Sequence, residues 1–382
     1  MIKLDIKKIY FFSVPLNRRI SNLNINLSRH VICAIGDGKH TGNGEGVIYR
    51  GTTLSAIRFY KSKILPFIRL HNFKNLSEAR TILSDKFAEK NSGIICALDL
   101  ALWDLEAKSK NKSLKEILKS RKNRIEITEE IFMDQLNLEN LNRVRKNGTK
   151  FIKIKIGKEI LFDYKNIKKI LSKFDFRIRA DANQYFIPKD LPKLERIFSE
   201  LKIRELEEPV RRHHIAKVKN KNKIILDESI MSKADLTRAL SRGYGIYNIK
   251  ISRLGGLTRS LDFIKEIEKR GKKIVIGCSE ELGIATYALL CLASSVKNLH
   301  STEGLGSDRL KFDIVSPGFN IKNGMVDIPA NINFREAKLR FASKKFGFKI
   351  SEDAKVSWDF LLYELKQDIL GKFKNLWIKV TG

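Results

Sequence analysis

The sequence predicts an α/β fold in which a closed parallel barrel of the TIM type follows a smaller N-terminal domain. Eight short runs with strand character alternate with helical stretches from about residue 124 onward, and this alternation is typical of such a barrel. Charged residues also recur at the ends of successive runs, about one βα unit apart. The runs are 124–133, 151–156, 176–180, 202–206, 224–226, 247–251, 273–277 and 298–302.

The same order of elements is compatible with an open doubly wound sheet, but no phosphate-binding glycine loop follows the first strand. Ahead of the barrel, residues up to about 50 have the pattern of strands and turns, and helical patterns occupy about 53–120. The stripe of Ile94, Leu98 and Leu105 predicts a core helix. We interpret the glycine-rich segment 40–46 as a hairpin or loop, because it lacks the context of a dinucleotide site.

Composition is that of a large globular protein. The chain has 382 residues and is 43% hydrophobic, which is ample for a barrel and a smaller domain. No apolar stretch approaches the roughly 18–20 residues that span a bilayer, and the alternating start is not that of a signal peptide. The four cysteines lack CxxC spacing, so we expect buried thiols and a cytoplasmic location.

The formal net charge is +31, which raises the question of nucleic-acid binding. The lysines are spread over the whole length, and no zinc-finger, RNA-recognition or basic-zipper pattern is present. We therefore do not expect a nucleic-acid partner, and a noncatalytic polyanion-binding protein is kept only as the alternative from another class. The surplus of positive charge can attract anionic substrates to a cleft.

Two lysines stand out in the segment 151–157, which reads Phe-Ile-Lys-Ile-Lys-Ile-Gly. Because the segment alternates with period two, Lys153 and Lys155 share one face of a strand and the isoleucines share the other. A solvated edge strand is the alternative interpretation. The aliphatic back face indicates a cover of helices, which would leave both ammonium groups in an interior, where each needs a partner or a task.

Further charged residues stand at or just after the ends of the later runs: Asp181, Glu207, Asp227 and Lys250. Parallel strands of a barrel end at one face, so these side chains are expected to converge. One such acid alone would be interpreted as a helix cap or surface residue. Three converging carboxylates stay ionised only with a cation between them, and oxygen-only ligands favour Mg²⁺.

Lysines beside a Mg²⁺ site indicate a reaction at the carbon next to a carboxylate. The α-proton of a metal-bound carboxylate is more acidic, because the cation stabilises the enediolate. Lys155 can remove this proton if neighbouring positive charge lowers its pKa toward neutrality. Lys250, several strands round the ring, would face the opposite side of the α-carbon. Two such bases permit racemisation or epimerisation of a small-molecule carboxylate.

The motifs of this chain resemble those of the enolase superfamily, in particular of the mandelate racemase/muconate lactonizing enzyme family. Within that family, they resemble the group of muconate cycloisomerases and dipeptide epimerases. The matching motifs are Val14-Pro15-Leu16, Gly42-Asn43-Gly44-Glu45, the segment 97–104, the two-lysine run, the three acid motifs, Asn248-Ile249-Lys250, Gly255-Gly256 and Cys278-Ser279-Glu280. The resemblance implies a modified (β/α)7β barrel with an α+β capping domain. We expect the cap at 1–120, the barrel at 121–325 and a returning C-terminal segment at 326–382.

The resemblance also implies roles for single residues. Lys155 and Lys250 would be the acid/base pair, and Lys153 would stabilise the substrate carboxylate. The Mg²⁺ ligands would be Asp181, Glu207 and Asp227, supported by Asn183 and Glu228. Substrate contacts would come from Glu303 and from Arg19, which lies in the first of two lid loops, at about 16–25 and 49–53. An ordinary solvated arginine is the alternative interpretation of Arg19.

The predicted outcome is racemisation or epimerisation of an N-substituted amino acid or dipeptide. Dipeptide epimerases carry an Asp-x-Asp pair in the eighth strand, whereas this chain has Glu303 and Leu305. A muconate-type cycloisomerase is therefore a near alternative, and a dehydratase resembling o-succinylbenzoate synthase is a further one. At the C-terminus, residues 355–378 predict an added amphipathic helix that packs on the cap or forms a subunit contact, and we expect a homo-oligomer.

Overall fold

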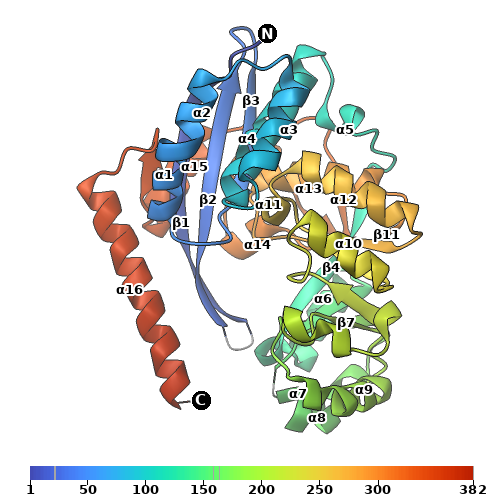
Figure 1. Cartoon of the computed structure of the whole chain (residues 1–382). Helices are drawn as coiled ribbons and strands as arrows, with labels where there is room; N and C mark the ends of the chain where they lie inside the picture. Colours follow the sequence, from blue (N-terminus) through green and yellow to red (C-terminus); the bar gives the residue numbers. More distant parts are fainter. Residues whose placement is uncertain (21–22, 158, 163, 382) are drawn as a thin grey trace.

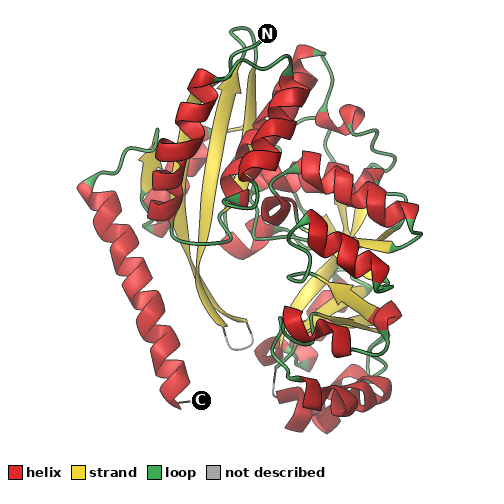
Figure 2. Cartoon of the chain, viewed as in Figure 1, coloured by secondary structure: helices red, strands yellow, loops and turns green. Residues whose placement is uncertain are grey.

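The protein is described here by a computed structural model that covers residues 1–20, 23–157, 159–162 and 164–381. Side chains are described outside 17–26, 158–159, 162–163, 166 and 371–382. An antiparallel sheet with its helices lies beside a barrel in Figure 1. Figure 2 shows helices on the outside of the barrel strands and against the sheet.

The first part is built on a sheet of order β16-β1-β2-β3. Its strands are β1 (Asp5–Ile20), β2 (Leu23–Gly36), β3 (Thr41–Val47) and, from the far end of the chain, β16 (Ile350–Glu352). Four helices follow β3: α1 (Thr53–Phe59), α2 (Leu65–Leu70), α3 (Leu76–Phe87) and α4 (Ser92–Ser109). The core helix predicted from its apolar stripe is α4, with Ile94, Leu98 and Leu105 buried.

The interpretation of segment 40–46 as a hairpin or loop is wrong for most of its length, because Thr41–Val47 form strand β3. Its glycines serve close packing of a helix on a strand. A Cβ at Gly42, Gly44 or Gly46 would lie about 2 Å from a backbone oxygen of α4. The missing side chains thus let α4 lie directly on the strand.

The second part is a closed parallel barrel of eight strands, which confirms the predicted fold class and excludes the open sheet. Neighbouring strands pair in chain order from β4 to β11, and β11 pairs with β4 to close the ring. The strands are β4 (Arg124–Phe132), β5 (Phe151–Lys155), β6 (Arg177–Asp181), β7 (Glu205–Glu207), β8 (Ile224–Leu226), β9 (Ile246–Ile249), β10 (Lys273–Ile276) and β11 (Leu299–Glu303). Because β5 lies between β4 and β6, the solvated-edge alternative for the two-lysine run is wrong.

Helices connect and surround these strands. They are α5 (Leu114–Ile117), α6 (Leu138–Lys146), α7 (Glu159–Phe162), α8 (Tyr164–Leu171), α9 (Leu191–Glu200), α10 (Lys233–Ser241), α11 (Ile251–Leu254), α12 (Leu257–Lys269), α13 (Gly283–Ser295) and α14 (Gly306–Leu310). The aliphatic back faces of the strands, among them Ile152 and Ile154, are buried in the main apolar core.

Buried polar contacts join the two parts. Glu45 of β3 accepts hydrogen bonds from the backbone N–H groups of Leu282 (2.6 Å) and Ala285 (3.1 Å) at the start of α13. Asp99 of α4 accepts from the backbone N–H of Thr258 in α12 at 3.1 Å. The cap therefore sits in a defined position over the barrel.

After the barrel the chain returns to the cap. The remaining strands are β12 (Val315–Ser316), β13 (Ile321–Lys322), β14 (Met325–Asp327), which pairs with β4, and β15 (Asn333–Phe334). They are followed by α15 (Glu336–Phe346) and α16 (Trp358–Thr381). The predicted C-terminal helix is α16, and it packs against the cap sheet: its Glu364 accepts a hydrogen bond from Ser13 Oγ at 2.9 Å.

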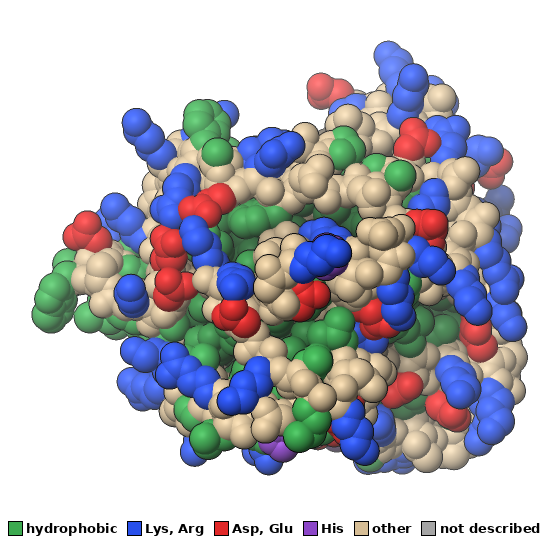
Figure 3. Space-filling view, turned by 90° about the horizontal axis from the view of Figure 1, so that it is seen from above, with side chains coloured by type: hydrophobic (Ala, Val, Ile, Leu, Met, Phe, Trp, Pro, Cys, Tyr) green, Lys and Arg blue, Asp and Glu red, His purple; other side chains and the backbone are tan. Residues whose placement is uncertain are grey.

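Lysines and arginines are spread over the visible face in Figure 3, with acidic side chains between them. This agrees with the even distribution of basic residues along the sequence. The four cysteines are free and buried, as expected. Within the described part of the chain, every helix lacks the combination of length and apolar content that a bilayer span requires.

Candidate active site

The predicted lysines and acids gather at the carboxyl ends of the barrel strands. In the sheet register Lys155 of β5 lies opposite Asp181 of β6, and Asp181 lies opposite Glu207 of β7. Asp227 and Lys250 directly follow β8 and β9. All five side chains are buried, so the strands bring together the charged residues that the sequence spacing singled out.

Lys155 is held by two of the predicted residues. Its Nζ lies 2.6 Å from Asp181 Oδ2 and donates to Asn183 Oδ1 at 2.9 Å. Burial alone would lower the pKa of Lys155, but the carboxylate of Asp181 outweighs it, so the pKa lies above its ordinary value. The expected lowering toward neutrality is thus not produced by the protein groups, because a carboxylate is the nearest partner.

Lys250 is placed in a similar way on the other side of the ring. Its Nζ lies 2.9 Å from Asp227 Oδ2. Burial opposes the charge of Lys250, but Asp227 raises its pKa well above the ordinary value. Arg253, one turn further in α11, pairs with the other oxygen of Asp227, and burial of Asp227 is outweighed by Arg253 and Lys250, which lower its pKa to about 2.

Lys153 is the centre of a buried ion network. Its Nζ lies 2.7 Å from Glu303 Oε1, 3.3 Å from Glu130 Oε1 and 3.4 Å from Asp181 Oδ2. Burial would lower the pKa of Lys153, but Glu303 and the other acids raise it well above its ordinary value. The side chain predicted to stabilise a substrate carboxylate is therefore present as a buried cation.

Both oxygens of Glu303 already have protein donors. Oε1 accepts from Lys153 and from Arg179 Nη2, each at 2.7 Å, and Oε2 accepts from the backbone N–H of Cys278 at 3.1 Å. Burial would raise the pKa of Glu303, but Lys153, Lys250 and Arg179 hold it well below the ordinary value. The geometry therefore gives Glu303 the role of pairing with the buried basic side chains of the site, Lys153 and Arg179.

The negative charge of Glu207 is less well compensated by neighbouring protein groups. Its Oε1 accepts from Asn248 Nδ2 at 2.8 Å, and its Oε2 lies 3.5 Å from Arg179 Nε without a hydrogen bond. Burial and the neighbouring Asp181 raise the pKa of Glu207 to about 8. This carboxylate lies where an additional cation would favour its ionised form.

The residues predicted to support the acids also interact. Asn183 donates from Nδ2 to Glu228 Oε1 at 3.1 Å and from its backbone N–H to Asp181 Oδ1 at 3.0 Å. Glu208, which the sequence did not single out, accepts from the backbone N–H groups of Asp227 and Ser229, each at 2.7 Å. It thereby fixes the loop that presents Asp227.

The acid side chains fit a hard cation by chemistry and burial. As placed, each acid engages a basic or amide side chain, and no three His, Cys, Asp or Glu side chains among the described residues are positioned to hold one ion together. Glu207 Oε2 and Glu228 Oε2 are nevertheless buried without a hydrogen-bond donor among the described residues. Buried carboxylate oxygens of this kind are the ligands that Mg²⁺ takes.

Besides Glu208, sequence reasoning missed four further residues that contact the predicted site residues: Glu130, Arg179, Arg253 and Arg309. Arg179 had a signal, because it lies two residues before Asp181 in β6 and so shares its face. Arg253 lies in α11, after the extended residue Lys250 that caps this helix, so strand periodicity does not reach it. Glu130 lies near the end of the first barrel strand, with its Oε1 3.2 Å from Lys155 Nζ, and it pairs with Arg309 of α14 at 2.5 Å. No local pattern marks these two.

The proposed substrate contact Arg19 lies in β1, in the hairpin with β2. Its side chain, like much of the first lid segment 16–25, falls outside the described residues. The second lid segment, 49–53, is described and leads into α1. Tyr49 of this segment is 40% exposed, and its ring centroid lies 5.9 Å from the guanidinium carbon of Arg253.

Comparisons with known proteins agree with this architecture. The family described as mandelate racemase/muconate lactonizing enzyme, N-terminal domain, matches residues 9–118, and the family described as enolase C-terminal domain-like matches residues 137–332. The chain is 28% identical over 271 residues to the hydrophobic dipeptide epimerase of Enterococcus faecalis, covering 67% of this chain and 75% of that protein.

Two further relatives cover more of the chain. The o-succinylbenzoate synthase of Bacillus subtilis is 27% identical over 349 residues, which are 86% of this chain and 92% of that protein. The solved structure of a dipeptide epimerase from Methylococcus capsulatus, complexed with Mg and the dipeptide L-Arg-D-Lys, has the same fold. Its TM-score is 0.72 at 24% identity, covering 86% of this chain and 97% of that one.

The named relatives are enzymes, which sets aside the noncatalytic polyanion-binding alternative, and the isomerase class predicted from the sequence fits them. The barrel, the cap and the matches to both domains lead to one conclusion. The chain belongs to the mandelate racemase/muconate lactonizing enzyme family of the enolase superfamily and is an enzyme.

Proposed function

We propose that this enzyme removes the proton next to a substrate carboxylate with one lysine and returns a proton with another. The observation that carries the proposal is the position of the two amines. Lys155 ends β5 and Lys250 follows β9, which is four strands away in either direction round the eight-stranded ring. Their buried side chains therefore approach a bound α-carbon from opposite sides.

The acids that would hold Mg²⁺ are Asp181, Glu207 and Asp227, on the three strands between the lysines. When bound there, Mg²⁺ supplies an electrophile that binds the substrate carboxylate and stabilises the charge that develops as the proton leaves. Lys153, next to Lys155 on the same face of β5, would bind the same carboxylate. Engagement of Asp181 by a second cation would weaken its hold on Lys155 and lower the pKa of this lysine.

The outcome proposed is racemisation or epimerisation of an N-substituted amino acid or a dipeptide. Relatives named as dipeptide epimerases and N-succinylamino acid racemase support it. The second candidate is a dehydration like that of o-succinylbenzoate synthase, because the relative of that name in Bacillus subtilis covers 86% of the chain. A muconate-type cycloisomerisation would use the same lysines.

The test is proton exchange followed by NMR in D₂O. Purified enzyme with Mg²⁺ is incubated with single enantiomers of N-succinylamino acids and with dipeptides. We expect deuterium at the α-carbon together with inversion. Dehydration or cycloisomerisation would instead give a product of different constitution.

Variants of the two lysines test the mechanism. Lys155→Ala and Lys250→Ala should each abolish inversion, and each should keep exchange only for the enantiomer whose α-proton faces the remaining lysine. The matched control is Lys150→Ala, an exposed lysine of the same segment, which should leave both rates unchanged. If the two site variants invert substrate at the wild-type rate, the two-base mechanism is wrong.

A further inference from the structure

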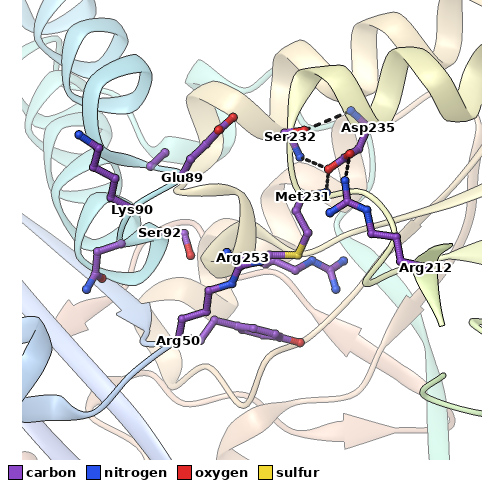
Figure 4. A pocket seen from close by; sticks show the side chains of 12 residues that line it. Arg50, Glu89, Lys90, Ser92, Arg212, Met231, Ser232, Asp235 and Arg253 are labelled. Carbon is purple, nitrogen blue, oxygen red and sulfur yellow. Dashed lines mark hydrogen bonds and ion pairs between the residues drawn. The ribbon is translucent and has the colours of Figure 1, made fainter. Parts of the chain in front are cut away.

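A cavity of about 250 Å³ lies between the cap and the barrel, and it contains none of the predicted catalytic residues. In Figure 4, Lys90 and Ser92 of the cap stand on one side and Arg212, Met231 and Ser232 of the barrel loops stand on the other. Arg50 and Arg253 lie between these two groups (Figure 4). The cavity therefore has walls from two parts of the fold.

Positive charge is in excess in this cavity, because its acids already have partners. Glu89 pairs with Arg259 at 2.7 Å, and Asp235 pairs with Arg212 and accepts from the backbone N–H of Ser232 at 3.0 Å. By contrast, no salt bridge within the described part of the chain engages Arg50 or Lys90, which line the cavity from the cap side.

Arg253 is the second, independent sign of a ligand. Its side chain is fully buried and lines the cavity. Nη2 pairs with Asp227 and donates to the backbone oxygen of Asn248 at 3.1 Å, but Nε and Nη1 have no hydrogen-bond partner among the residues that the structure describes. Buried donors without a partner are costly, and a guanidinium presents a planar set of donors that matches an oxyanion.

The N-terminus of α4 also favours an anion in this cavity. This helix has 18 residues, and its N-cap Asn91 accepts from the N–H of Ile94 at the side chain and from the N–H of Ile95 at the backbone oxygen. The remaining N–H groups of the first turn and the helix dipole favour negative charge at this end. Ser92, the first residue of the helix, lines the cavity.

We propose that this cavity binds an oxyanion, a carboxylate or phosphate group, between Arg50 and Lys90 of the cap and Arg253 of the barrel. The bound anion satisfies the free donors of Arg253 and links cap to barrel beside Asp227 and Lys250. The inference goes beyond the proposed reaction and does not depend on it, because binding is measured without substrate.

The experiment is calorimetric titration of the full chain with inorganic phosphate, without divalent cations and at constant ionic strength. We expect saturable binding of one phosphate per chain. Arg50→Ala combined with Lys90→Ala should weaken this binding at least about tenfold, because hydrogen bonds between charged groups are the strong ones. Both residues are exposed, so the double variant should keep the wild-type fold, which circular dichroism checks.

The matched control is Lys112→Ala combined with Arg121→Ala, which removes one lysine and one arginine that are exposed elsewhere. It should bind phosphate like the wild type. Equal weakening in both double variants would assign the binding to the general positive surface and overturn the proposal. A titration without saturation in the wild type would also overturn it.

Two further arms identify the source of the anion. Titration with succinate instead of phosphate shows whether carboxylates bind at the same residues. If the anion belongs to a substrate tail, the cap double variant raises KM for substrates with a distal carboxylate and leaves KM for neutral-tailed substrates unchanged. If the anion is a free phosphate, KM is unchanged for both and the phosphate affinity alone falls.

Discussion

At the scale of single residues, the site depends on a buried balance of charge in which Glu303 is central. This carboxylate pairs with Lys153 and Arg179, which are both fully buried. Glu303→Gln keeps the shape but leaves these two cations without their shared partner. We expect the free energy of unfolding to fall by about 3 kcal/mol, the typical cost of breaking a buried ion pair, as measured by urea denaturation without substrate.

The control for this prediction is Glu352→Gln, which breaks an exposed ion pair with Arg340. Exposed pairs contribute little, so its effect should stay below about 1 kcal/mol. If Glu303→Gln is as stable as the wild type and loses only substrate affinity, Glu303 contacts substrate in the way predicted from the sequence and does not hold the network together.

The sequence predicted the lysines and acids of the site but not most of their partners. Lys155 and Asp181 could be predicted because strand periodicity and βα spacing place them at one end of the barrel, whatever the loops do. Glu130 and Arg309 could not, because their contact joins the first barrel strand to a helix beyond the last one. Pairing across the ring seam has no local signature in sequence.

At the scale of elements, β3 shows how a glycine pattern can be misread. Alternate glycines 42, 44 and 46 suggest a loop when chain flexibility is the only criterion. In the structure they form the face of a strand on which α4 lies, and a Cβ at Gly44 would be 1.9 Å from Ala97 O. Sequence alone does not reveal this reason, because it depends on how closely α4 approaches.

Gly44→Ala should therefore destabilise the cap strongly. The added methyl group meets backbone on α4 and forces strand and helix apart, so we expect a loss of about 3 kcal/mol in the free energy of unfolding, at the upper end for overpacking. Gly318→Ala is the matched control, since nothing lies within 4 Å of its Cβ position, and it should change stability by no more than about 0.5 kcal/mol. Similar urea midpoints for the two variants would contradict the packing explanation.

The stability of the contact between α4 and α12 should depend on pH, because Asp99 of α4 titrates in an accessible range. Burial raises the pKa of Asp99 to about 6, whereas the unfolded chain has an ordinary value near about 4. Between these values the folded protein binds more protons, so this residue lowers the free energy of unfolding as pH rises from about 4 to about 6. Asp99→Asn removes that contribution and keeps an acceptor for Thr258.

Urea unfolding at several pH values checks this prediction. Relative to the wild type, Asp99→Asn should gain on the order of 2–3 kcal/mol across this pH range, since one pKa unit corresponds to about 1.4 kcal/mol. Asp262→Asn, which changes an exposed residue of α12, should show the same pH dependence of the free energy of unfolding as the wild type. The same pH dependence in Asp99→Asn would show that Asp99 does not titrate in this range.

At the scale of the whole molecule, the barrel was predictable and its joint with the cap was not. The count and order of βα units fix the ring, because connections between parallel strands are right-handed and short. The relative position of cap and barrel rests on contacts such as those of Glu45 with the start of α13 and of Asp99 with Thr258. These contacts join residues 237 and 159 positions apart, which periodicity does not connect.

The net charge of +31 should affect the rate at which an anionic substrate arrives. Basic side chains are spread over the visible face without forming one patch (Figure 3), and the field of the positively charged molecule attracts anions from a distance and is screened by salt. We expect kcat/KM for a dianionic substrate to fall about tenfold when sodium chloride rises from about 10 mM to about 500 mM. Turnover at saturating substrate should change little, because the buried lysines are screened far less.

A zwitterionic dipeptide is the control, and its kcat/KM should fall with salt concentration along a shallow slope. Equal slopes for the two substrates would mean that the surplus charge does not steer the substrate.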